Sequence, residues 1–188
     1  MTTLVAVDAP AEGTQTLETD AAADLAREAR GHAKAALDEL RALSSGVAPP
    51  LLQDRGLAAA LTAVAANTAL AVHVDVDPIV DSAVGPEVAR TVYFTVAELL
   101  TNAVKHSGAS AATLKAALRP AAADAPAMLD VWVVDNGRGG ASIREGHGLE
   151  GLADRVAGLR GTMIVDSPVG GPTAVGVHIP LTSVDRAL

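Results

Sequence analysis

The sequence predicts an α/β (α+β) fold, a two-layer sandwich in which a mixed sheet carries its helices on one face. From residue 56 onward the expected order is helix, strand, helix, strand, strand, helix, strand, strand. Two pairs of strands are consecutive, which favours antiparallel neighbours, and the strict strand–helix alternation of a doubly wound sheet is absent. Ahead of this domain, apolar residues recur at three- and four-residue steps over 20–45, which predicts a long N-terminal helix.

The individual elements follow from periodicity and from breaker residues. Apolar residues that alternate with polar ones, or that cluster as short β-branched runs, predict strands. Pro86 suits the first turn of a helix, and Gly108 is placed to end the same helix. The strands are expected at 71–77, 111–118, 128–135, 162–166 and 174–181, and the helices at 56–70, 86–107 and 149–159.

Composition limits the possible partners and the chemistry. The chain has 188 residues, of which 49% are hydrophobic but only 2% aromatic, so the core must consist of Val, Leu, Ile and Ala. A net charge of −8 argues against nucleic acid as the main partner, because phosphate neutralisation needs clustered Lys and Arg. The absence of cysteine excludes disulfides, thiolate zinc sites and thiol nucleophiles.

The N-terminal residues do not have the pattern of a secretory signal. Residues 1–19 carry no basic residue before their short apolar run, and they are expected to form a disordered leader. The longest uncharged stretch, 56–72, is rich in Ala and short for the roughly 20 apolar residues that a span needs. We therefore expect a cytoplasmic chain without membrane contact of its own, either by itself or as the cytoplasmic part of a membrane-bound protein.

One helical stretch combines an apolar face with an unusual polar face. Glu98, Asn102, Lys105 and His106 lie at i, i+4, i+7 and i+8, which places them on an arc of roughly 100°. A carboxylate and an amide followed by two cationic groups could hold a metal ion beside an anion. An ordinary amphipathic helix with a solvated face is the alternative. The opposite, apolar side is expected to contain Val92, Val96, Leu99, Leu100, Ala103 and Val104.

Two glycine-rich segments follow. Asp135, Gly137 and Gly139 stand at a strand end, where a fixed carboxylate could accept a hydrogen bond from an exocyclic amine; a simple turn is the alternative. Segment 146–151 matches G-x-G-x-x-G, but no strand runs into its first glycine, so it is a weak dinucleotide fingerprint. Glycines that open a helix can still let backbone N–H groups approach a phosphate, although a flexible loop would look the same.

Taken together, these motifs and the Gly-x-Thr at 171–173 resemble the ATP-binding domain shared by histidine kinases, gyrase and related ATPases, over about 51–181. Upstream, 35–43, 49–52 and 56–61 are similar to the second dimerisation helix and junction of NarL/DesK-type sensor histidine kinases. The resemblance implies a Bergerat-type fold. It divides the chain into the leader 1–19, a partial dimerisation helix 20–48 and a catalytic domain 49–188.

The resemblance also implies ATP and Mg2+ as ligands. Asn102 would bind the metal, and the implied catalytic residues are Glu98, which would orient water or assist transfer, with Lys105 and His106 on the phosphates. Asp135 would accept the adenine amino group, with Thr173 in support. The implied nucleotide-binding residues are Asn102, Asp135, Gly137, Gly139, Gly146, His147, Gly148, Leu149 and Thr173, of which 146–149 belong to the lid.

The five histidines depart from this pattern, because none is followed by Asp or Glu as a phosphoacceptor would be. His73 and His178 are expected in strands with no partner. We therefore expect a histidine kinase catalytic part that does not phosphorylate itself. Its partners would be an acceptor-histidine helix, a response regulator and a second copy through 20–45. The alternatives are an anti-sigma-type serine/threonine kinase and a non-catalytic nucleotide-sensing interaction module. Arg160 stands where the family commonly has the first of two paired glycines, and Pro172 interrupts the usual glycine–threonine run.

Overall fold

The computed structural model describes residues 49–122, 125–143 and 148–181. Several predictions concern other parts of the chain. The leader 1–19, the dimerisation helix 20–48 with its proposed dimer contact, and the lid residues Gly146 and His147 lie outside the described residues.

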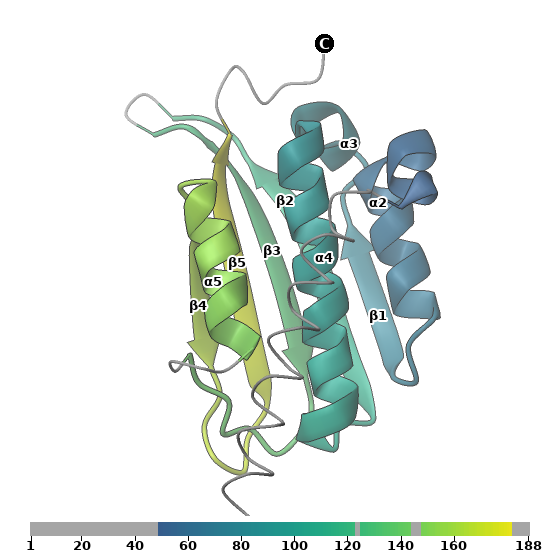
Figure 1. Ribbon diagram of the computed structural model, residues 1–188, viewed down its shortest axis with the longest axis vertical. Helices are drawn as coiled ribbons and strands as arrows, with labels where there is room; N and C mark the ends of the chain where they lie inside the picture. Colours follow the sequence, from purple (N-terminus) through teal and green to yellow (C-terminus); the bar gives the residue numbers. More distant parts are fainter. Residues whose placement is uncertain (1–48, 123–124, 144–147, 182–188) are drawn as a thin grey trace, which may run out of the picture. The chain divides into compact units, whose positions relative to one another are not determined.

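The sheet has five strands in the order β1-β2-β3-β5-β4 (Figure 1). β1 pairs with β2 in parallel, whereas β2–β3, β3–β5 and β4–β5 are antiparallel, so the predicted mixed sheet is confirmed. The two consecutive strand pairs of the sequence are the antiparallel neighbours β2–β3 and β4–β5. The bounds are β1 Ala71–Val76, β2 Ala111–Arg119, β3 Ala127–Asp135, β4 Thr162–Asp166 and β5 Thr173–Leu181.

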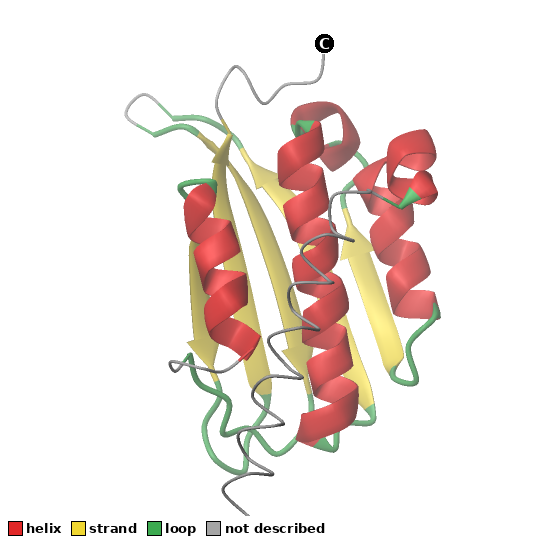
Figure 2. Ribbon diagram, viewed as in Figure 1, coloured by secondary structure: helices red, strands yellow, loops and turns green. Residues whose placement is uncertain are grey.

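The helices cover one face of this sheet, as Figures 1 and 2 show. Side chains on β3 alternate accordingly, with Leu129, Val131 and Val133 buried under the helices while Asp130 and Trp132 are half-buried on the other face. This confirms the two-layer arrangement. The helical elements are α2 Pro50–Ala66, α3 Val80–Ala83, α4 Pro86–Asn102, the π-helical turn η1 Ala103–Ser107, and α5 Gly148–Gly158.

The core between the layers is aliphatic, as the composition predicts. Every fully buried hydrophobic residue in the described ranges is Leu, Val, Ile or Ala. The aromatic rings of Tyr93, Phe94 and Trp132 are only half-buried. No helix in the described part of the chain is both long and apolar enough to cross a bilayer.

Helix α2 differs from the prediction at both ends. It begins at Pro50 and ends at Ala66, and it bends at Gly56, where φ is +82°. The second segment starts there because the carboxylate of Asp81 accepts a 2.8 Å hydrogen bond from the backbone N–H of Ala58. A Cβ at position 56 would lie 2.6 Å from Asp81 Cγ, so the bend needs glycine. The short helix α3, which supplies Asp81, was not predicted.

The end of the predicted helix 86–107 also needs a correction. Its last turn, η1, is π-helical rather than α-helical, and Gly108 ends it in the left-handed conformation (φ +67°) as expected. A π turn holds more residues than an α turn, so side-chain directions after Asn102 rotate away from the α-helical pattern. Val104, which was expected on the apolar face, is therefore 42% exposed.

Candidate functional site

The candidate site begins where the end of β3 is paired with the start of β5, in the interior of the sheet. Asp135, the last residue of β3, is the register partner of Thr173, the first residue of β5. The two side chains are buried, with exposures of 6% and 9%. They lie far apart in the sequence, and only the pairing of the two strands brings them together.

The Asp135 carboxylate keeps free acceptor capacity. Its Oδ1 accepts a 2.8 Å hydrogen bond from the N–H of Gly137, two residues on. Within the described ranges this carboxylate has no other hydrogen bond and no basic partner. A buried carboxylate is stabilised by further donors. The group therefore fits a ligand that offers an N–H, such as an exocyclic amine.

The loop after Asp135 is attached to the end of helix α4 and η1. The N–H of Arg138 donates to the carbonyl of Ser107 at 2.9 Å. A Cβ on Gly137 would lie 2.5 Å from Ser107 Cβ and 2.6 Å from the same carbonyl oxygen, so only glycine allows this approach. The Ser107 hydroxyl is itself engaged, because it donates to Ala103 O at 2.8 Å and accepts from Ala109 N at 3.0 Å.

The same loop is held on its other side by the segment that precedes β5. Gly170 N–H donates to the carbonyl of Arg138 at 2.7 Å, and Gly140 N–H donates to the carbonyl of Ser167 at 3.0 Å. Gly139 has φ +64°, and a Cβ there would overlap the carbonyl oxygen of Pro168. A simple turn, the alternative for this segment, would not account for these hydrogen bonds and close contacts with two other parts of the chain.

Ser167 connects the loop to the buried pair. Its hydroxyl is 2.9 Å from the hydroxyl of Thr173, and it accepts a 2.9 Å hydrogen bond from the N–H of Ala141. Sequence reasoning missed both Ser167 and Ser107. A single serine carries no pattern of its own, and proximity to the predicted motifs was the only available signal.

The four polar residues of the helix lie on α4 and η1, ahead of Ser107. Glu98 and Asn102 are half-buried on α4, whereas Lys105 and His106 are exposed on η1. None of the four has a side-chain hydrogen bond or ion pair with another described residue. The two oxygen-bearing groups are thus partly shielded, and the two basic groups are open to solvent.

The described lid residues lie at the start of α5. Gly148 is its first residue and is exposed, with open space around the position that a Cβ would take. Leu149 is half-buried and packs against the hydrophobic core. No described contact links these two residues to Asp135 or to Asn102, so their assignment to the nucleotide site stays a prediction.

His178 was expected to have no partner, and this is wrong. Its Nδ1 lies 2.7 Å from Asp130 Oδ1, and Arg119 forms two hydrogen bonds, of 3.0 and 3.1 Å, to the same carboxylate. The hydrogen bond from Arg119 is the main cause that lowers the pKa of Asp130; burial opposes it to a smaller extent, and the hydrogen bond from His178 lowers the pKa further. These side chains lie on the sheet face away from the helices, so the cluster does not belong to the candidate site.

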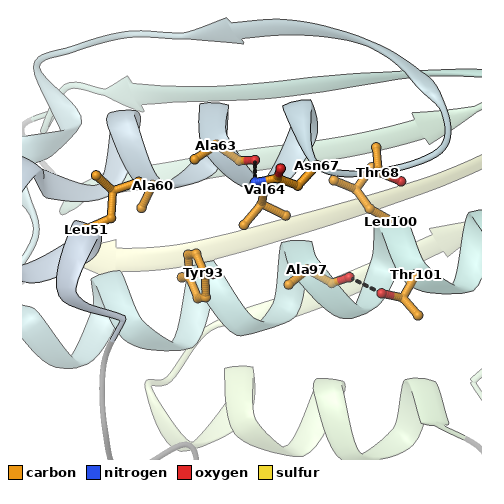
Figure 3. Close-up of a pocket in the computed structure, with 10 residues that line it drawn as sticks. All are labelled: Leu51, Ala60, Ala63, Val64, Asn67, Thr68, Tyr93, Ala97, Leu100 and Thr101. Atoms are coloured by element: carbon orange, nitrogen blue, oxygen red, sulfur yellow. Dashed lines mark hydrogen bonds between the residues drawn. The ribbon is translucent and has the colours of Figure 1, made fainter.

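A separate hollow of about 420 Å3 lies between α2 and α4 (Figure 3). It contains none of the predicted site residues and no charged side chain, so it offers nothing for a phosphate. Two of its polar side chains bond to their own helices, Asn67 to Ala63 O and Thr101 to Ala97 O. Its lining consists of Leu51, Ala60, Ala63, Val64, Asn67, Thr68, Tyr93, Ala97, Leu100 and Thr101.

The fold and the site describe a two-layer α/β domain with a buried acceptor carboxylate at a strand end. No family model matches the sequence. The chain is 32% identical over 148 residues to the sensor histidine kinase MctS of Rhizobium johnstonii, a match that covers 73% of this chain. The chain spans only 31% of the length of that relative.

Two solved structures were also compared. The blue-light activated histidine kinase EL346 of Erythrobacter litoralis has a TM-score of 0.49 at 28% identity, over 66% of this chain and 39% of its own. The histidine kinase AdeS of Acinetobacter baumannii has a TM-score of 0.46 at 14% identity, over 94% of this chain and 88% of its own. The sequence similarity to MctS relates this chain to the sensor histidine kinases and supports a histidine kinase catalytic domain.

Proposed function

We propose that this chain contains the ATP-binding catalytic part of a NarL/DesK-type sensor histidine kinase. The reaction is transfer of the γ-phosphoryl group of ATP to a histidine that is none of the five in this sequence. The observation that carries the proposal is the buried Asp135 carboxylate, which has one oxygen engaged by Gly137 and acceptor capacity left over. The similarity to a sensor histidine kinase supports it.

The adenine end of the proposed site consists of groups that are already in place. Asp135 accepts a hydrogen bond from the exocyclic amino group of adenine. Thr173 lies beside it, with its hydroxyl held by Ser167. Gly137 and Gly139 keep the loop close to the carboxylate because neither position has room for a Cβ. A guanine base would present a carbonyl oxygen where adenine has its amino group, and the carboxylate would disfavour it.

The phosphate end is assigned to α4 and η1. The amide oxygen of Asn102 is a suitable donor for Mg2+, a hard cation that takes oxygen ligands. Bound with ATP, Mg2+ would neutralise developing charge on the phosphates. Glu98, one turn earlier, orients water or assists transfer. Lys105 and His106 are exposed and can reach phosphate oxygens. The lid over the phosphates is assigned to Gly146, His147, Gly148 and Leu149, of which the first two lie outside the described residues.

The protein partners follow from the missing acceptor. The phosphoryl group passes to a histidine on a partner helix and then to a response regulator. Segment 20–45, which lies outside the described residues, is assigned the contact between two copies of the chain. The chain alone binds ATP with Mg2+ and does not phosphorylate itself.

Calorimetric titration of the purified chain with ATP and GTP tests the binding part of this proposal. ATP is expected to bind with Mg2+, and Asp135→Asn to weaken it by about 10- to 100-fold, because a charged acceptor is lost and an amide N–H2 then faces the base. Asn67→Ala removes an amide just after the end of α2, away from the site, and serves as the control. Equal affinity for ATP and GTP, or an unchanged affinity in Asp135→Asn, would contradict the assignment.

Labelled ATP tests the chemistry. Added to the chain with a separate acceptor-histidine helix, it is expected to give acid-labile phosphate on that helix and none on this chain, and Asn102→Ala is expected to abolish the transfer. Acid-stable phosphoserine on a partner would indicate the anti-sigma type of kinase instead. Nucleotide binding without any transfer would indicate an interaction module.

A further inference from the structure

We propose that Ser107 is a positioning residue that holds the two ends of the nucleotide site in register. The proposal rests on the proposed function, because it assumes that one ligand contacts both Asp135 and Asn102. Ser107 is the last residue of η1, and its side chain is buried. It has three kinds of contact, through its hydroxyl, its carbonyl and its Cβ.

The hydroxyl fixes Ser107 to the end of the helix that carries Asn102. It donates to the carbonyl of Ala103, the residue next to Asn102, at 2.8 Å. It also accepts the N–H of Ala109, beyond the helix end, at 3.0 Å. One buried side chain thus ties the start of the π turn to the chain that leaves it. These two bonds determine the direction in which the Ser107 carbonyl points.

The carbonyl and the Cβ of Ser107 transmit this position to the loop after Asp135. The carbonyl accepts the N–H of Arg138 at 2.9 Å, and Gly137 packs so closely on Ser107 that a Cβ would lie 2.5 Å from Ser107 Cβ. Gly137 in turn donates to the Asp135 carboxylate. The path from Asn102 to Asp135 therefore passes through Ser107, by three hydrogen bonds and one close packing contact.

This geometry leads to a specific expectation about ligands. A contact made at one end of the site alone does not depend on the distance between the ends. Binding of ATP through Mg2+ does depend on it, because the metal joins the phosphates to Asn102 while the base stays on Asp135. Without the hydroxyl the Ser107 carbonyl loses its fixed direction, and the gain in affinity that Mg2+ brings is reduced.

The test measures the dissociation constant of ATP in EDTA and in Mg2+, and divides the value in EDTA by the value in Mg2+. In Ser107→Ala we expect this ratio to fall by about tenfold, while binding in EDTA changes by less than about twofold. Thr101→Ala is a matched control. It removes the same kind of bond, a hydroxyl to the carbonyl four residues earlier at 2.8 Å on the same helix, but it does not touch the loop. Its ratio is expected to stay at the wild-type value.

Measurements are made below the melting temperature of every variant, so that a loss of stability alone does not change the ratio. Equal ratios for Ser107→Ala and Thr101→Ala would overturn the role of Ser107. If Ser107→Ala does not fold, Ser107→Cys keeps the size with a weaker donor and is expected to give a smaller fall; an unchanged ratio there would likewise overturn it. A wild-type chain that does not bind ATP would overturn the proposed function and this role together.

Discussion

Three glycines around the Asp135 loop allow backbone strain and steric overlap to be separated by experiment. Gly170 has φ +82° with nothing within 4 Å of the position of a Cβ. Gly137 has no positive φ, but a Cβ there would lie 2.5–2.6 Å from Ser107 and Asp135 atoms. Gly139 combines both conditions, with φ +64° and overlap with the Pro168 carbonyl. Each is changed to alanine.

The expected losses in the free energy of unfolding follow from these geometries. Gly170→Ala is expected to cost about 1–2 kcal/mol, the penalty of a left-handed conformation for an L-residue. Gly137→Ala is expected to cost about 1–3 kcal/mol, because rigid backbone and buried atoms must move apart. Gly139→Ala should combine the two, about 2–5 kcal/mol. Alanine also stiffens the unfolded chain, but it does so equally in all three variants and cancels in the comparison.

Urea unfolding followed by circular dichroism gives the three free energies by linear extrapolation. A larger loss of unfolding free energy in Gly139→Ala than in Gly137→Ala and Gly170→Ala supports a loop that is held between η1 and the segment before β5. If Gly139→Ala costs no more than Gly170→Ala, the Pro168 carbonyl does not confine the loop. If Gly137→Ala is neutral, Ser107 does not pack on it, and the path from Asn102 to Asp135 described above is wrong.

Two further predictions concern residues outside the site. The pKa of Asp130 lies below its ordinary value of 3.8. The contribution of this carboxylate to stability is therefore fully present above that value and is lost as pH falls through the lowered pKa. In urea unfolding, the difference in stability between wild type and Asp130→Asn should shrink between about pH 5 and pH 2, and a difference independent of pH would contradict the ion pair. Arg160 is the only described non-glycine residue with positive φ (+56°). Arg160→Gly should therefore raise the free energy of unfolding by about 1 kcal/mol. A lowered melting temperature would show instead that the arginine side chain stabilises the fold by more than its strained backbone destabilises it.

The structure explains how an arginine fits at position 160, where the family resemblance leads one to expect glycine. The residue follows α5 and takes the left-handed position that glycine usually occupies after a helix. Gly161 N–H then donates to Val156 O at 3.0 Å, which closes the helix end. Gly161 itself has no room for a side chain, because a Cβ there would lie 2.8 Å from the carbonyl oxygen of His178. The substitution therefore changes the strain at this turn but not its course.

The sequence by itself determined the strands, the mixed sheet and the aliphatic core. These properties depend on patterns of a few residues, such as the alternation in 128–135, and on which residue types are present at all. The Asp135-x-Gly-x-Gly segment could be singled out for the same reason, because its carboxylate and glycines are neighbours in the chain. The limits of α2 and the π turn were not predicted, since Asp81 and the packing of η1 decide them.

Only the tertiary structure decided which residues meet. Asp135 faces Thr173 because β3 and β5 are paired in one register, and Asp130 meets His178 through the same pairing. A shift of one residue would turn every side chain to the other face, and no local pattern in either strand specifies the partner. The contacts of Ser107 with the Asp135 loop arise in the same way, since they depend on where a helix end and a strand end lie in space.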